Sequence, residues 1–242
     1  MLHRVFDIRT SHNLVSFRSH AIKNGPLAAY PAEQTTFQHN CTNAPCVVTS
    51  INIPSIYPTG GNLFDWENGR LCVYIDGESS PSINVTILEL AHVGALAAIS
   101  SDTPVDGSPF GNDLFGKTAK TGGVYTTMRI PFASSIRTTI TAPPSATAAA
   151  VFWFVIRGIE ALPITLGSEL ILPDQARLTM QRVNRVNIQP RDIVTLASVP
   201  NGTAGALVTV MMDAQSMDLT FLEGCMRFFA NGAAAPQFLS SG

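Results

Sequence analysis

The feature of this sequence that most constrains its fold is a series of short runs rich in β-branched and aromatic residues, spaced about ten residues apart. Gly, Pro, Asn or Asp bounds most of these runs, and those residues favour tight turns. Such a series is typical of an all-β sandwich or jelly roll, which is the fold class that we predict. The runs occupy residues 46–53, 70–75, 83–90, 124–130, 136–141, 149–156, 176–183, 193–199, 206–212, 218–224 and 226–230.

Three stretches allow sharper expectations. Residues 151–156 are continuously apolar, which favours a central buried strand. Residues 85–98 are compatible with a helix, or with a strand followed by a short helical turn. Residues 91–123 contain a long segment rich in Gly and polar residues, and loops of this length are usually functional or disordered. Its aromatic residues Phe110 and Phe115 favour an ordered loop.

Charge and hydropathy exclude some classes of partner. Of the 242 residues 13% are charged, and the formal net charge of −2 supplies no basic field for nucleic acid or an anionic membrane. No apolar segment approaches the roughly 18 residues that a membrane-spanning helix needs. The first residues hold no continuous apolar run, so they do not predict a secretory signal, and the compartment stays open.

The cysteine and histidine residues give no ligand pattern. The four cysteines, Cys41, Cys46, Cys72 and Cys225, follow no metal-binding spacing, and the histidines do not either. We therefore expect no metal and no cofactor. Cys41 and Cys46 are close enough to bridge around a small loop, although Pro45 within that loop leaves the pairing open.

The domain organisation that we expect has three parts. Residues 1–38 read as an irregular arm, residues 39–185 as a first jelly-roll domain, and residues 193–242 as the first strands of a truncated second one. A weak internal repeat supports this division, because residues 72–83 align with residues 227–238 at a constant offset of 155. The repeat is either a true duplication or a coincidence of common hairpin signals. For Asp76 and Glu78, in the first copy, we expect a solvated hairpin turn.

Glu223 is the candidate catalytic residue. It is a lone carboxylate within an apolar run, where ionisation costs free energy unless a partner compensates. Either a structural ion pair holds such a residue, or it performs chemistry that needs a poised carboxylate.

Five segments of the chain, taken together, resemble a known family. They are VYIDGESSPSI, PFGNDLFG, GGVYTTMRIPF, VFWFVIRGIEALP and FLEGCMRFF, and they span roughly residues 46–242. The resemblance is to glycoside hydrolase family 172, whose members are α-D-fructofuranosidases, difructose-dianhydride enzymes and α-D-arabinofuranosidases. It implies two consecutive jelly rolls, assembly as trimers or hexamers, and a carbohydrate substrate of the α-furanoside type.

The resemblance also implies roles for individual residues. Two glutamates form a retaining pair in this family, and the first of them corresponds to Glu223. The second lies in a Gly-Thr-Glu-Asp-Tyr-Phe motif that would begin where this sequence ends, so we expect a truncated chain that is inactive alone. Independently of the resemblance, Phe110 and Tyr125 are interpreted from their residue types as a sugar-binding wall, because aromatic faces and polar edges suit carbohydrates, with loop packing as the alternative. Arg129 is taken as a substrate-binding residue. For a cation that keeps Glu223 ionised, Arg129 and Arg157 are as plausible as Arg227, which lies closer to Glu223 in the sequence.

Two functions therefore compete. The first is the N-terminal part of a retaining glycoside hydrolase. The second is a non-catalytic jelly-roll protein that binds glycans or assembles through its sheets. Whether this chain is itself an enzyme stays open.

Overall fold

The structure, a computed structural model, is all-β in the part of the chain that it describes. Its strands form antiparallel sheets, and its one described helix is the single turn α2 (Ile87–Leu90). None of the described helical residues forms a helix long and apolar enough to cross a membrane. The described residues are 16–18, 22–27, 33–58, 68–90, 110–111, 113–119, 122–146, 150–166, 170–183, 188–189, 191–200, 202–210 and 226–240.

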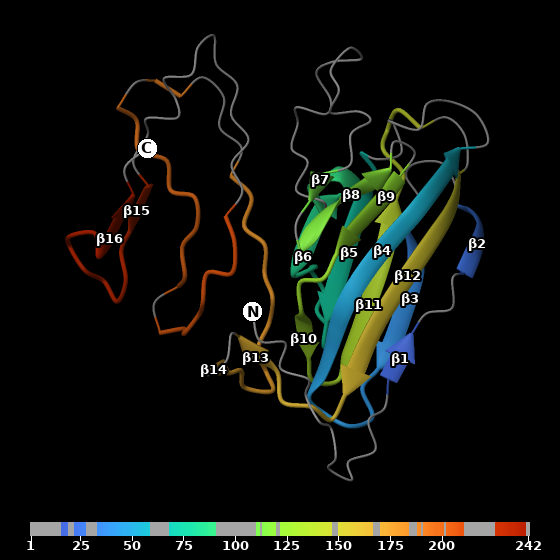
Figure 1. Cartoon of the computed structure of the whole chain (residues 1–242), viewed down its shortest axis with the longest axis horizontal. Helices are drawn as coiled ribbons and strands as arrows, with labels where there is room; N and C mark the ends of the chain where they lie inside the picture. The colour runs from blue at the N-terminus through green and yellow to red at the C-terminus, as the bar shows by residue number, and fades with distance from the viewer. Residues whose placement is uncertain are drawn as a thin grey trace, which may run out of the picture.

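Two sheets make up the body of the molecule. The larger is 8-stranded, with the order β1-β12-β4-β9-β8-β7, while β10 also pairs with β4 and β2 with β12. The smaller is 4-stranded, with the order β3-β11-β5-β6. In Figure 1, β4 and β12 of the larger sheet pass in front of β5 and β11 of the smaller one. The larger sheet holds β1 (Ser16–Arg18), β2 (Ile22–Leu27), β4 (Cys46–Pro58), β7 (Phe110–Gly111), β8 (Phe115–Ala119), β9 (Gly122–Thr126), β10 (Ile130–Phe132) and β12 (Ala150–Glu160). The smaller holds β3 (Glu33–Asn40), β5 (Arg70–Ile75), β6 (Ile83–Thr86) and β11 (Ser135–Thr141).

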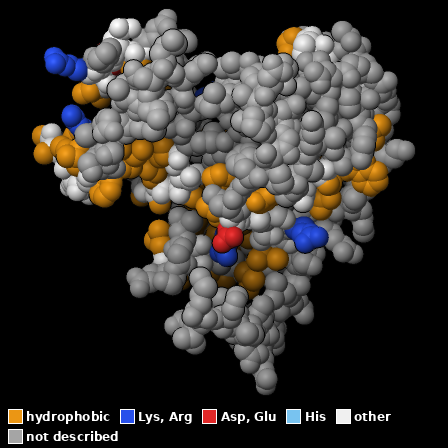
Figure 2. Space-filling view, turned by 45° about the horizontal axis from the view of Figure 1, so that its top comes forward, with side chains coloured by type: hydrophobic (Ala, Val, Ile, Leu, Met, Phe, Trp, Pro, Cys, Tyr) orange, Lys and Arg blue, Asp and Glu red, His pale blue; other side chains and the backbone are white. Residues whose placement is uncertain are grey.

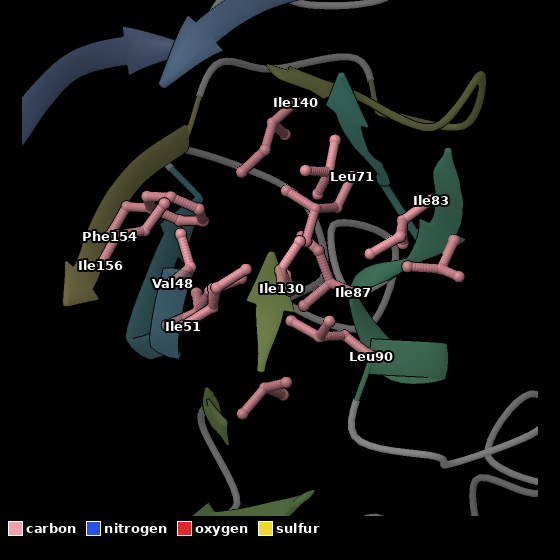
Figure 3. Packing of buried hydrophobic residues seen from close by; sticks show 14 of the residues in the cluster. Val48, Ile51, Leu71, Ile83, Ile87, Leu90, Ile130, Ile140, Phe154 and Ile156 are labelled. Atoms are coloured by element: carbon pink, nitrogen blue, oxygen red, sulfur yellow. The ribbon is translucent and has the colours of Figure 1, made fainter. Parts of the chain in front are cut away.

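One hydrophobic core joins the two sheets. Alternate residues of β5 point inward, as do Ile51 and Ile53 of β4, because successive side chains of a strand face opposite sides. Figure 3 shows side chains of β4 and β12 on one side of this core and those of β5, β6 and α2 on the other. Each fully buried aliphatic or aromatic side chain contributes about 1.5–3 kcal/mol of transfer free energy. The largest are Phe132, Phe154, Ile51, Ile53, Leu71, Ile75, Ile87, Ile130 and Ile136.

Several predicted strands are confirmed. The runs at residues 46–53, 70–75 and 136–141 lie in β4, β5 and β11. The run at residues 83–90 is a strand followed by a helical turn, β6 and α2, which was one of the two alternatives. The apolar stretch at 151–156 lies inside β12 but is not buried throughout, since Trp153 is 36% exposed on the outer face of its sheet.

The N-terminal segment differs from the irregular arm that we expected, in its described parts. β1 and β2 both pair with β12, and β3 pairs with β11 through a register from Glu33↔Thr141 to Asn40↔Ser135. The sequence of these strands shows little hydrophobic periodicity, so it did not predict them. A strand added to an existing sheet can gain most of its order from backbone hydrogen bonds to that sheet.

Three predicted strands beyond the sandwich are wrong. Residues 176–183, 193–199 and 206–210 are described and contain no strand. Ile164 is the last buried residue of the described part, although Leu178 and Met180 pack against the core while partly buried. A β-prone run becomes a strand only where a partner strand pairs with it.

Two separate hairpins lie beyond the sandwich. They are β13 (Thr165–Leu166) with β14 (Leu170–Ile171), and β15 (Met226–Phe228) with β16 (Phe238–Ser240). In Figure 1 the β15–β16 hairpin stands apart from the two large sheets.

The β15–β16 hairpin repeats the geometry of β5–β6 at the offset of 155. Val73 pairs with Ile83 in the first hairpin, and the equivalent Phe228 pairs with Phe238 in the second. Each hairpin turns through an Asx-Gly pair with positive φ, 51° and 78° in the first and 54° and 71° in the second. Even the turn hydrogen bonds correspond, because Glu78 N donates to Ile75 O and Ala233 N to Ala230 O. The alignment seen in the sequence is therefore matched by register and turn conformation.

Candidate functional site

The structure describes part of the predicted site. Glu223 lies outside the described residues. Phe110 begins β7, and its side chain also lies outside the described part. Tyr125 lies in β9, whereas Arg129 follows that strand and is exposed. Nη1 of Arg129 donates a hydrogen bond of 3.2 Å to the backbone oxygen of Thr165.

Tyr125 lines an open groove on the outer face of the larger sheet. Its neighbour across the strands is Asn52, which in turn pairs with Val155 of β12. Arg157, two residues further along β12, pairs with Ser50 and lies in the same groove. The groove has a volume of about 330 Å³ and combines an aromatic ring with hydroxyl, amide and guanidinium groups. Its described lining is Ser50, Ile51, Asn52, Pro54, Tyr125, Thr126, Thr127, Val155 and Arg157, which does not include Arg129.

A buried carboxylate is the last residue of β12. Glu160 is 1% exposed, and its Oε1 accepts a hydrogen bond of 2.7 Å from Nε2 of His39. Its Oε2 accepts bonds from the backbone N–H of Thr42 at 3.2 Å and of Asn43 at 3.0 Å, and from the Asn43 side-chain amide at 3.3 Å. The carboxylate thus anchors the loop between β3 and β4.

The environment keeps Glu160 ionised. Burial raises the pKa of Glu160, but hydrogen bonds from His39 and from the backbone of Asn43 and Thr42 outweigh that effect and hold the pKa below its ordinary value. His39 itself lies between two aromatic rings, stacked with Phe37 at 6.3 Å and edge-on to Phe132 at 6.2 Å.

A disulfide closes the same loop. Cys41 and Cys46 are bonded, with their Cα atoms 6.1 Å apart, so the pairing that the sequence left open is formed. The two sulfur atoms and a carboxylate oxygen of Glu160 all lie within 4.8 Å of one another. Among the described residues these three bring ligand atoms this close together, but while the disulfide is intact its sulfur atoms are not available as thiolate ligands.

Asp76 also organises a distant loop, which corrects the expectation of a solvated turn residue. Its carboxylate accepts hydrogen bonds from the backbone N–H of Ala133, Ser134 and Ser135, between 2.5 and 3.1 Å. It also forms an ion pair with Nη2 of Arg177. Burial raises the pKa of Asp76. The hydrogen bonds from the three backbone donors lower that pKa by more than burial raises it, so it lies below its ordinary value.

Polar side chains satisfy one another on the outer face of the smaller sheet. Oε1 of Glu33 accepts from Thr139 at 2.6 Å and from Tyr74 at 2.9 Å, and Arg137 lies 3.9 Å from the centre of the Tyr74 ring. Burial, followed by the charge of Glu33, raises the pKa of the nearby Cys72 thiol. Because the thiolate is the nucleophilic form, Cys72 is a poor candidate for a reactive cysteine.

Sequence reasoning missed Glu160 and the role of Asp76. Glu160 ends an apolar run, which is the same signal that drew attention to Glu223. Its partners, however, lie 117 to 121 residues away in the sequence, so no local pattern indicates them. Asp76 gave only a turn signal. The backbone N–H groups that donate to its carboxylate lie 57 to 59 residues away in the sequence.

Comparison with known proteins gives no match to any protein-family model and none to a curated protein sequence.

Proposed function

We propose that this chain is a jelly roll, followed by elements of a second one, from a retaining glycoside hydrolase that cleaves α-furanosides. The resemblance to glycoside hydrolase family 172 implies this function. The observation that carries it furthest is the repeated hairpin, because β5–β6 and β15–β16 share their register and turn at one constant offset. Self-similarity at a fixed offset is the signature of a duplicated unit.

Glu223 is the residue on which the proposed chemistry depends. It precedes β15 by three residues, and the position equivalent to it in the first copy is Asn68. A carboxylate at this position therefore belongs to the second copy alone. In the proposed reaction the Glu223 carboxylate attacks the anomeric carbon, the glycosidic oxygen leaves with a proton from a second carboxyl group, and water then hydrolyses the glycosyl ester.

Covalent labelling tests this role directly. A dinitrophenyl leaving group departs without a proton, so the nucleophile can be assayed by itself. The chain is incubated with dinitrophenyl α-D-arabinofuranoside or α-D-fructofuranoside, released dinitrophenolate is measured, and peptides are mapped by mass spectrometry. We expect one glycosyl ester, located on Glu223.

Two variants accompany the labelling. Glu223→Gln is expected to abolish the ester and the dinitrophenolate burst, because an amide cannot act as this nucleophile. Glu78→Gln changes a carboxylate of the other hairpin copy and is expected to leave both unchanged. An ester on a different residue, or no ester with either sugar, would contradict the proposal.

Glycan binding without catalysis is a second candidate, and the groove around Tyr125 favours it. An aromatic ring beside the amide of Asn52 and the guanidinium of Arg157 suits a sugar, which offers apolar faces and hydroxyl edges. We expect saturable binding of furanosides in calorimetric titration, lost in Tyr125→Ala and kept in the control Tyr74→Ala. If Glu223→Gln also keeps this binding and the labelling fails, the non-catalytic function is the better account.

A further inference from the structure

The loop between β3 and β4 holds a donor set that neither proposed function uses. Cys41 and Cys46 flank the loop, and Glu160 of β12 lies beneath it. Their two sulfur atoms and one carboxylate oxygen lie within 4.8 Å of one another. Zinc takes thiolate sulfur at about 2.3 Å and carboxylate oxygen at about 2.0–2.2 Å in a tetrahedral arrangement. In the structure the two sulfur atoms are bonded to each other, so they become ligands that can meet the carboxylate oxygen at one centre only once the disulfide is reduced.

The four cysteines together follow no zinc-binding pattern, but the separation of Cys41 and Cys46 is compatible with the same chemistry. Four residues separate Cys41 from Cys46, which lies within the range of about two to four found between paired zinc cysteines. A second cysteine pair is missing from the sequence, and this is why the spacing alone predicts no metal site. The fold supplies Glu160 in its place, from 114 positions further along the chain.

The groups around Glu160 already hold its carboxylate in place and stabilise its negative charge. His39 donates to Oε1 at 2.7 Å, which fixes the orientation of the carboxylate, and such supporting donors are common around metal sites. The backbone donors Thr42 and Asn43 offset the negative charge that two thiolates and a carboxylate would leave around a divalent ion. Cys46 is fully buried, whereas Cys41 is partly exposed and gives the ion a route of entry.

We infer that, after reduction of the Cys41–Cys46 disulfide, the two thiolates and the Glu160 carboxylate bind one zinc ion, with water in the fourth position. A phosphine reductant supplies the two electrons and becomes a phosphine oxide, while water provides the oxygen and the two thiol protons. Zinc then displaces both thiol protons as its bonds to sulfur form. The pair is thus a disulfide in oxidising surroundings and a metal-binding dithiolate in reducing ones.

Cobalt(II) titration tests the inference, because cobalt takes the same tetrahedral sites and gives a thiolate charge-transfer band in the near ultraviolet. The full chain is reduced with a phosphine, titrated with cobalt(II), and then with zinc. We expect a band that saturates at one equivalent and disappears when zinc is added. The matched control is the same chain with its disulfide intact, which is expected to show no band. Absence of the band in the reduced chain overturns the inference.

Variants identify the ligands. Cys41→Ser and Cys46→Ser are each expected to reduce the thiolate band by about half or more, whereas the double variant Cys72→Ser/Cys225→Ser keeps it. Glu160→Gln is expected to weaken zinc binding by at least about 10-fold. If that variant does not fold, X-ray absorption of the zinc-loaded wild-type chain decides, with two sulfur and two lighter neighbours expected. A zinc environment without sulfur, or a band that survives in Cys41→Ser/Cys46→Ser, overturns the assignment.

Discussion

Two carboxylates, Glu160 and Asp76, each hold a loop that comes from a distant part of the chain. Each accepts several backbone N–H groups, and such groups need a partner when they are removed from water. Ionised acceptors make stronger hydrogen bonds than neutral ones. Both residues therefore stabilise the fold through their charge, and among the described residues neither is paired with a second carboxylate of the kind that acid–base catalysis uses.

Replacing Glu160 with glutamine is the first test of this role. We expect Glu160→Gln to lower the free energy of unfolding by about 1–3 kcal/mol, because a neutral amide accepts more weakly and brings an N–H group into a cluster of donors. Urea denaturation followed by circular dichroism measures the change. Asp174→Asn, a similar change at an exposed position, serves as the control and is expected to stay within about 0.5 kcal/mol of the wild type.

The pH dependence of stability follows from the same groups. The folded-state pKa values of Glu160 and Asp76 lie below the ordinary values of 4.5 and 3.8. Their stabilising contribution is therefore fully present above those values and is lost as the pH falls through the folded-state pKa. We expect the stability difference between wild type and Glu160→Gln to be constant from about pH 6 to pH 8 and to shrink below about pH 4. A difference that stays unchanged down to pH 3 would contradict this.

For single residues, the sequence can mark a carboxylate in an unusual environment, but it cannot assign the role of that carboxylate. A lone carboxylate in an apolar run correctly marks an unusual environment, and Glu160 shows that a hydrogen-bonded structural role is one outcome. The pattern cannot distinguish that role from catalysis, because the deciding partners arrive through the fold. For Glu223 the same choice rests on chemistry that labelling can test.

Among the secondary-structure elements, the two Asx-Gly hairpins depend most on single residues. Gly77 and Gly232 have φ values of 78° and 71°, which L-residues with a Cβ adopt only at a cost. A Cβ at either position would meet no atom within 4 Å, so the cost of a substitution is conformational rather than steric. The two turns therefore require the same property of their glycine, a positive φ.

Their consequences for stability should nevertheless differ. We expect Gly77→Ala to lower the free energy of unfolding of the sandwich by about 1–2 kcal/mol, because its hairpin belongs to the 4-stranded sheet. Gly232→Ala should leave that transition unchanged, because its hairpin pairs with no strand of either large sheet in the described part. Gly205→Ala, where a Cβ meets only Val199 at ordinary contact distances, is the control. Equal losses in both hairpin variants would mean that they unfold as one unit.

The elements that the sequence predicted well are those with strong alternation and a pairing partner. β5 alternates between buried and less buried residues along its whole length, β11 does so from Ser135 to Thr138, and both coincide with predicted runs. Residues 193–199 have comparable β propensity, yet they form no strand, because propensity expresses how well a residue fits a sheet that something else must complete. β1 and β2 show the opposite error, because they are strands that the sequence did not predict. Pairing with β12 is what orders them.

Across the whole molecule, burial ends well before the described chain does. No described residue beyond Ile164 is buried, and large apolar side chains of the later segment are exposed, with Ile193 at 79% and Phe238 at 59%. β15 and β16 lie on the left in Figure 1, and Figure 2, which is turned about the horizontal axis, shows hydrophobic side chains gathered on that same side. Exposed apolar clusters of this kind mark surfaces that another element or chain covers.

The boundary between the two regions is set by identifiable contacts. Arg177 pairs with Asp76, Arg182 pairs with Glu89 at 2.9 Å, and the backbone N–H of Met180 donates to Ser82. These contacts fasten the segment that follows β14 to the smaller sheet as far as Arg182. Neither pair could be inferred from the sequence, because each joins residues about 100 positions apart.

Limited proteolysis with thermolysin, which cuts beside apolar residues, should find this boundary. Cleavage needs a local segment to open, and opening is least costly where little surface is buried. We expect the first cuts within residues 193–210 and a resistant fragment that extends through Arg182, identified by mass spectrometry. In Arg177→Ala the fastened segment loses one of its contacts, so the end of the resistant fragment should move toward β14. Arg191 is an exposed arginine beyond the boundary, so Arg191→Ala is the control and should leave the end of the fragment in place. First cuts within β4, β5 or β11 would show instead that the sandwich, and not the later segment, is the weaker part of the molecule.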